Sequence, residues 1–169
     1  MQVRRRFLMS VFALAAASCS DPNAPAEEQN PRLDASNPPH HVLGSGHVEQ
    51  AAGFREFTFH AIDGANGAHG SYKIVLSSGL FFEADVTCLA VDGNTGWVGG
   101  VIRATNAGVV VVGSVSTFYA IDGGEGRAAI DIVSVATFNG AAGGDVAFCA
   151  NRPLALAPLT VTSGNVQVR

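Results

Sequence analysis

The sequence predicts a single antiparallel all-β domain over residues 42–169, in the form of a small up-and-down barrel of about eight or nine strands. All twenty glycines lie at or after Gly44, and no proline occurs between Pro39 and Pro153, which favours strands joined by glycine turns. Short runs of Val, Ile, Phe and Ala alternate with polar residues, and none follows a helical period. A β-sandwich built from the same strands is the alternative.

Two segments show the alternation of a half-buried strand most clearly. In Phe57 to Ala61 the aromatic residues share one face. From Leu80 to Ala90 the even positions are apolar, and the odd positions include polar residues, so one face should be buried and the other wet. The other expected strands are 42–48, 71–77, 97–105, 109–121, 127–138, 145–150 and 159–168.

A short repeat organises these strands. The segment Ala-[Ile/Val]-Asp-Gly occurs three times, with its aspartate at Asp63, Asp92 and Asp122. Asp-Gly between extended apolar runs is typical of tight hairpin turns, so three hairpins at a near-constant spacing predict a meander. Together with Asn94, these aspartates also resemble part of a calcium loop, although the alternating carboxylates and closing glutamate of such a site are missing. Turn chemistry therefore suffices, and calcium is the alternative.

Residues 1–18 predict a secretory signal peptide. Arg4 to Arg6 form a cationic end, and Phe7 to Ala17 is an apolar run too short to cross a bilayer as a mature helix. Small residues precede Cys19, which is the pattern that the bacterial lipoprotein signal peptidase cuts before the cysteine carries acyl chains. Ordinary cleavage near Ala17, leaving Cys19 unmodified, is the alternative. The arginines also fit the twin-arginine export pattern, but a general secretory signal is the simpler interpretation.

Residues 19–41 predict a lipidated cysteine followed by a disordered tether. Five prolines, four acidic residues and three asparagines between Ser20 and Pro39 leave too little apolar surface to offset the entropy of ordering. Cleavage before Cys19 removes three of ten basic residues and none of fourteen acidic ones, which leaves a net charge of −7. An acidic chain whose only lysine is Lys73 lacks a basic surface for nucleic acid or anionic headgroups.

We therefore expect the chain to be exported and held in a cell envelope by its acyl chains, at the outer membrane where the source has one. Without lipidation it would be periplasmic or secreted. No nucleic-acid partner is expected.

The cysteine count supports this interpretation. There are three cysteines, an odd number for an exported protein. With Cys19 assigned to lipid, Cys88 and Cys149 remain in apolar stretches and are the natural disulfide of an oxidising compartment. The bridge would close a loop of about sixty residues, worth roughly 3 to 4 kcal/mol. Two buried free thiols are the alternative.

No catalytic or cofactor motif stands out. Glu83 and Asp85 lie two residues apart on one strand face, as paired carboxylates of a glycosidase could, but a solvated strand face explains them. His47, His60 and His69 lie on strands expected to be neighbours, yet solvent-facing histidines are the simpler interpretation than a metal site. A nucleophile elbow, a phosphate loop and a dinucleotide fingerprint are all absent from the sequence. We expect no enzyme activity, metal or cofactor.

Two segments carry a resemblance. Cys88 to Gly100 contains C-x-x-V-x-G-N followed by paired glycines, and Ser163 to Val168 contains G-N-[IV]-Q-V. Both resemble a family of uncharacterised exported bacterial β-rich domains, and the resemblance extends loosely over residues 44–169. It implies a compact β domain behind a secretion signal, and it implies no activity and no functional residues.

Three functions fit this organisation. The first is a non-catalytic domain displayed from a membrane for interaction with envelope components or a protein, through an apolar or aromatic patch that could include Trp97 or Tyr119. The second is a barrel that holds a small apolar ligand in space left by small inward residues such as Ala84 and Gly100. The third is a barrel-type enzyme, which would need a cleft with convergent polar groups.

Overall fold

The computed structural model describes residues 39–51, 53–126 and 129–169. The predicted signal peptide (1–18), Cys19 and the tether up to residue 38 lie outside the described residues. Within the described ranges, no helix combines the length and the apolar character needed to cross a membrane.

The described part of the chain folds into one antiparallel sheet of nine strands in the order β8-β7-β6-β5-β4-β3-β2-β1-β9, which confirms the all-β prediction. Consecutive strands pair from β1 to β8, as a meander requires, and β9 returns to pair with β1. The strands and the one helix are β1 (His40–Gln50), β2 (Gly53–Gly64), β3 (Gly67–Leu76), β4 (Phe81–Asp92), β5 (Thr95–Thr105), β6 (Val115–Ile121), β7 (Ile132–Ser134), α1 (Gly144–Asn151), β8 (Pro158–Thr160) and β9 (Ser163–Val168).

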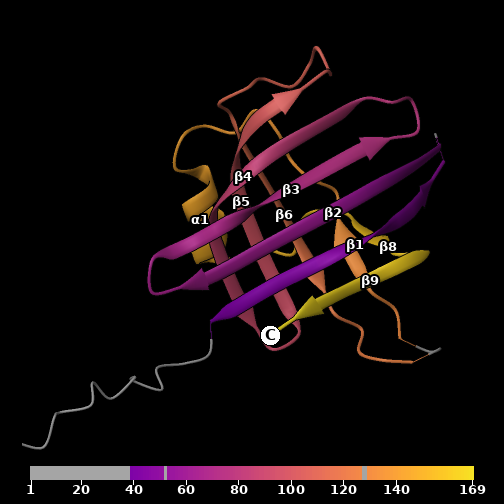
Figure 1. Cartoon of the computed structure of the whole chain (residues 1–169), viewed down its shortest axis with the longest axis vertical. Coiled ribbons are helices and arrows are strands. Elements are labelled where there is room, and N and C mark those ends of the chain that lie inside the picture. The colour runs from indigo at the N-terminus through magenta and orange to yellow at the C-terminus, as the bar shows by residue number, and fades with distance from the viewer. Residues whose placement is uncertain (1–38, 52, 127–128) are drawn as a thin grey trace, which may run out of the picture. The chain divides into compact units, whose positions relative to one another are not determined.

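The sheet curls into a half-barrel around its core. In Figure 1, strands β1, β2, β3 and β9 pass across β5 and β6, so the two halves of the sheet face each other. Aromatic rings meet between the halves: the ring of Phe118 in β6 lies 5.2 Å from that of Phe59 in β2 and 5.1 Å from that of Tyr72 in β3. The Tyr72 hydroxyl donates a hydrogen bond to the carbonyl of Ser116. Burial raises the pKa of the Tyr72 hydroxyl above its ordinary value. The middle of the barrel is therefore filled by side chains.

Glycines on β5 make room for these large neighbours. A Cβ at Gly96 would lie 2.3 Å from Cγ2 of Val42, and one at Gly100 would lie 2.9 Å from the ring of Tyr72. The small inward residues thus accommodate bulky partners in the middle of the barrel instead of leaving an empty space there.

The two edges of the sheet lie close together. β8 and β9 stand at opposite ends of the strand order, yet only Val161 and Thr162 separate them along the chain. The Thr162 amide donates to the carbonyl of His47 in β1 (2.8 Å), and the Val161 amide donates to the carbonyl of Asp131 beside β7 (3.0 Å). The sheet therefore curls nearly into the closed barrel that the meander predicts, and the Val161–Thr162 connection links its two edges.

Aspartate side chains bridge this seam. The N–H groups of Val166 and Val168 in β9 point away from β1 and reach the carboxylates of Asp131 (2.7 Å) and Asp122 (3.2 Å), respectively. Both carboxylates come from the connection between β6 and β7, on the other side of the seam. Amides on the outer edge of β9 are thereby satisfied without a neighbouring strand.

Two of the three predicted hairpin turns are present. β2 and β3 are joined through Ala65 and Asn66, and β4 and β5 through Gly93 and Asn94, where Gly93 has a φ of 57°. β6 and β7 also pair antiparallel, but the tight turn predicted at Asp122 is wrong, because β6 ends at Ile121 and β7 begins only at Ile132. Asp122 there accepts hydrogen bonds across the seam instead of starting a tight turn.

Four predicted strands differ from the structure. Residues 145–150 form α1, and residues 109–114 form a loop before β6. Within 127–138 the described residues hold only the three-residue strand β7, and 159–168 divides into β8 and β9. A short apolar run does not reveal by its period whether it is a strand, a helical turn or an exposed loop.

The alternation along β4 reverses in the middle of the strand. The pairing of β4 with β5 shifts between Glu83 and Ala84 and again between Val86 and Cys88. Before the second shift Val86 faces the core, and after it Leu89 does, so Cys88 lies on the outer face. The prediction that Cys88 continues the buried face of the strand is therefore wrong, and α1 is what buries it.

Candidate ligand-binding site

An apolar pocket lies at the end of the half-barrel opposite His40, where the described domain begins. Its cavity measures about 110 Å³. Its walls come from β2, β3, β4, the loop between β5 and β6, and the segment after β7. The lining residues are Arg55, Ile74, Leu76, Leu80, Phe81, Phe82, Ala107, Val109, Val110, Ala136 and Phe138. All of them except Arg55 are apolar.

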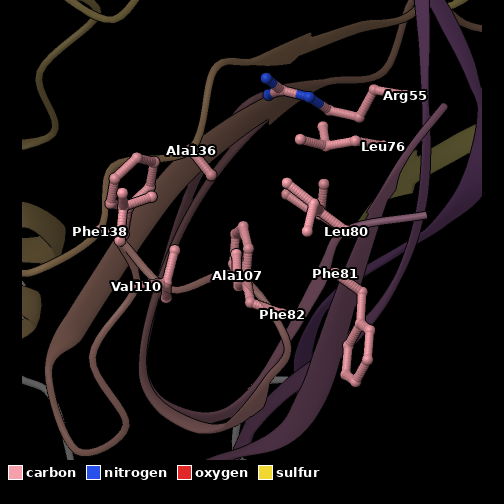
Figure 2. A pocket seen from close by; sticks show the side chains of 11 residues that line it. Arg55, Leu76, Leu80, Phe81, Phe82, Ala107, Val110, Ala136 and Phe138 are labelled. Atoms are coloured by element: carbon pink, nitrogen blue, oxygen red, sulfur yellow. The ribbon is translucent and has the colours of Figure 1, made fainter. Parts of the chain in front are cut away.

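Figure 2 shows how these side chains surround the space. Leu80 points into it from the turn between β3 and β4, and Phe138 and Val110 face Leu80 from the opposite wall. Arg55 crosses one end of the space and Phe82 lies at the other, whereas the ring of Phe81 turns away.

The rim of the pocket is apolar and open to solvent. Leu80 is 39% exposed, Phe138 46% and Val109 71%. Val111 and Val112 continue this surface on the same loop and are also exposed. Exposed aliphatic and aromatic side chains gathered around an apolar cavity are typical of a surface that binds another molecule.

Two asparagines fix the walls of the pocket. The Asn106 side chain accepts a hydrogen bond from the Phe81 amide (2.7 Å) and donates one to the carbonyl of Gly79 (3.1 Å), so it ties the β3–β4 turn to the end of β5. Asn139 accepts a hydrogen bond from the Val111 amide (2.9 Å) and donates one to the Val109 carbonyl (2.7 Å). The pocket is thus built before any ligand arrives, which lowers the entropic cost of binding.

Arg55 is the charged residue of the pocket. It lies on the same strand face as Phe57 and Phe59, at the open end of the barrel. Its Nε is buried and has no hydrogen-bond partner among the described residues, and burial lowers the pKa of its guanidinium from the ordinary value. No described carboxylate forms an ion pair with it. The side chain still carries its charge at neutral pH, because a guanidinium deprotonates only at very high pH.

The predicted calcium residues do not gather at one point. Asp122 belongs to the seam, and the side chain of Asn94 donates to the Asp122 carbonyl (2.7 Å). Asp92 pairs with Arg152 (3.4 Å), and Asp63 stands at the end of β2. Over residues 39–51, 53–126 and 129–169, no group of three or more His, Cys, Asp or Glu side chains is placed to hold a metal ion.

The predicted disulfide between Cys88 and Cys149 is present, with a Cα–Cα distance of 6.2 Å. It fastens α1 to the outer face of β4, next to a hydrogen bond from the Thr87 hydroxyl to the Asp145 carboxylate.

The segment that follows α1 covers two aromatic residues. The Trp97 indole donates to the carbonyl of Pro153 (3.0 Å), and the Tyr119 hydroxyl donates to that of Leu156 (3.0 Å). Both aromatic side chains are buried, so the expectation that they form an exposed patch is wrong. Three exposed apolar side chains, Leu80, Val109 and Phe138, gather instead at the pocket.

The candidate acids and histidines lie outside the pocket. Glu83 pairs with Lys73 (2.8 Å) and with Arg103 (3.3 Å) on the outer face of the sheet, and the hydrogen bond from Lys73 is the main cause of its lowered pKa. Asp85 also pairs with Arg103 (3.0 Å). His47 contacts Glu49 (3.0 Å).

The other two candidate histidines, His60 and His69, are exposed and stand opposite Ser71 and Ile62 in the β2–β3 ladder. The structure therefore brings none of these residues together with the pocket.

Sequence reasoning missed the pocket, although one signal was available. Arg55 precedes Phe57 and Phe59 at the spacing of a single strand face, and a charge on an otherwise apolar face marks an unusual position. The rim could not be found in this way, because the valines from Val109 to Val112 read as part of a strand.

Comparison with protein-family models, with curated proteins and with solved structures gives no match for this chain. The geometry of the pocket is therefore the basis for assigning a function.

Proposed function

We propose that this chain is an exported bacterial lipoprotein whose β domain binds, without catalysis, the apolar part of a small molecule in the pocket at the end of the half-barrel. The observation that carries the proposal is the apolar cavity with its exposed rim of Leu80, Val109 and Phe138. Burying such a rim together with an apolar ligand is favourable by about 25 cal/mol for each Å² removed from water.

The cavity size restricts the ligand. Pockets that enclose a whole drug-sized ligand usually measure roughly 300–1,000 Å³, whereas this one measures about 110 Å³. It has room for the end of an alkyl chain or a small ring. The remainder of a larger molecule would lie on the rim or in solvent.

The lining supports binding without catalysis. General acid–base or nucleophilic catalysis needs groups that can exchange a proton or attack near neutral pH. The pocket is lined by apolar side chains and by Arg55, which is a cation without a neighbouring base. A barrel-type enzyme finds no support in this lining.

A protein partner is the second candidate, and the exposed loop Val109–Val112 favours it. Val111 and Val112 are each 57% exposed and lie beside the pocket rim, where an apolar side chain of a partner could insert. The two candidates share a surface but differ in what occupies the cavity.

Replacing Leu80 with aspartate tests the pocket as the binding site. A carboxylate at the mouth would have to be desolvated by an apolar ligand, so L80D should weaken the binding of a neutral apolar dye such as N-phenyl-naphthylamine by about tenfold or more. L154D is the matched control, because Leu154 is also exposed (58%) but does not line the pocket. Fluorescence titration of the mature chain measures both constants. Equal binding by L80D and L154D would exclude the pocket.

Intact mass measurement tests the anchor. The full chain, expressed with its first 18 residues in a bacterium and extracted from membranes, should begin at Cys19 and carry acyl chains on it. The variant C19S should lack that added mass and leave the membrane fraction, since attachment depends on the acyl chains. A mature chain that begins before Cys19 and carries an unmodified thiol would overturn the lipoprotein assignment while leaving the pocket untouched.

A further inference from the structure

We propose that the ligand is a single-chain alkyl carboxylate of medium length, held with its tail in the pocket and its carboxylate on Arg55. This inference rests on the proposed function and adds the chemistry of the head group. Its basis is the position of Arg55 at one end of an otherwise apolar cavity, with a buried Nε that has no hydrogen-bond partner among the described residues.

The surroundings of Arg55 leave a hydrogen-bond donor without an acceptor. Long cationic side chains often lie along apolar surface with their charge in water, which accounts for the methylene stem of Arg55 over the barrel end. It does not account for Nε, which is shielded from solvent and has no acceptor among the described residues. A buried N–H without a partner is unfavourable, and a ligand oxygen placed beside it removes that penalty.

Three other cations of the described residues have ion-pair partners. Lys73 and Arg103 pair with Glu83 on the outer face, and Arg152 pairs with Asp92. Arg55 thus combines an inward position with the absence of an ion pair to any described carboxylate. Its planar fork of donors suits a carboxylate, which can accept two parallel hydrogen bonds.

The charge of the chain favours a head group with one negative charge. The chain from Cys19 onward carries a net charge of −7, so a multiply charged phosphate would be repelled more strongly than a carboxylate. The single guanidinium in the lining can neutralise one charge. The small cavity favours one alkyl chain over two.

Titration calorimetry with three ligands of equal chain length separates tail from head. We use the mature chain, residues 19–169, with C19S so that no acyl group competes for the pocket. Decanoate should bind about tenfold more tightly than decanol and decyltrimethylammonium. Shortening decanoate to octanoate should weaken binding by up to about fourfold for each methylene lost from the pocket.

Variants of two arginines assign the head group. R55Q should weaken decanoate binding by about tenfold and leave decanol binding unchanged, and R55K should restore part of the loss. R103Q removes the same charge from the outer face and should change the dissociation constant of neither decanoate nor decanol. Thermal melts check that each variant is folded.

The possible outcomes separate this inference from the proposed function. If decanol and the neutral dye bind as tightly as decanoate, the carboxylate head group is overturned and the apolar site is kept. The same conclusion follows if R55Q leaves the dissociation constant of decanoate unchanged. Failure of all apolar ligands would overturn both. If the protein sediments with phosphatidylglycerol vesicles but does not bind free decanoate, the inference is overturned and a membrane surface is the partner instead.

Discussion

Replacing Cys88 and Cys149 together with alanine should lower the free energy of unfolding by about 4 kcal/mol, because the disulfide restricts the unfolded chain across a long loop. The two cysteines are 61 residues apart in the sequence. Since domains of this size are stable by only about 5–15 kcal/mol, the variant should lose a large part of its stability. Urea denaturation followed by circular dichroism measures the change, and the slope should increase because the unfolded chain is more expanded.

The effect should also have a local part. The disulfide holds α1 against β4, and the same side of the sheet carries the Trp97 and Tyr119 hydrogen bonds to the segment after α1. Without the disulfide, this segment should open before the rest of the domain, with faster amide exchange in α1 than in β2 or β3. C19S is the control, since it removes the third cysteine without touching the pair. A loss below about 1 kcal/mol would contradict the loop-closure account.

The strands that were predictable from sequence are those with one face against the core and the other in water. β2 alternates between buried and more exposed residues along most of its length, and the turns at Gly93 and near Asp63 follow from residues that tolerate a tight reversal. In these segments the local preference and the tertiary contacts agree, so the pattern alone is sufficient.

The C-terminal third could not be predicted in the same way. Helix α1 is one short apolar segment whose buried positions, Asp145 and Cys149, are four residues apart, and it depends on the disulfide and on Thr87 for its place. The bulges in β4 that turn Cys88 outward are set by pairing with β5. Such features arise from partners distant in sequence, which a local pattern does not contain.

The pocket illustrates the same limit for a site. Arg55 could be recognised as a charge on an apolar strand face, but its role depends on Leu80, Val109 and Phe138 from three other segments. The asparagines that fix those segments, Asn106 and Asn139, act through hydrogen bonds across more than twenty residues. A cavity exists only once its walls are assembled. The sequence can therefore indicate that a barrel could hold a ligand, but not that the pocket lies at one end of it.

The second large effect should come from Asp131, whose buried carboxylate accepts hydrogen bonds from the amides of Gly123 (2.9 Å) and Val166 (2.7 Å). Asp131→Ala leaves both amides without their acceptor at the seam of the sheet. Val166 is buried, whereas Gly123 is exposed and its hydrogen bond is part-buried. A buried donor that loses its partner costs about 1–3 kcal/mol and an exposed one less, so the free energy of unfolding should fall by about 3 kcal/mol. Asp131→Asn should cost about half as much, because its amide oxygen still accepts one of the two bonds.

The control and the site of opening make this prediction specific to the seam. Asp63→Asn makes the same chemical change at the β2–β3 turn, and it should alter the free energy of unfolding by less than about 0.5 kcal/mol. In Asp131→Ala, hydrogen exchange should rise first in β9, because its outer edge depends on the two bridging aspartates and not on a neighbouring strand. Equal stability of Asp131→Asn and Asp63→Asn would show that the curled sheet holds its seam closed through the Val161–Thr162 connection and the core alone.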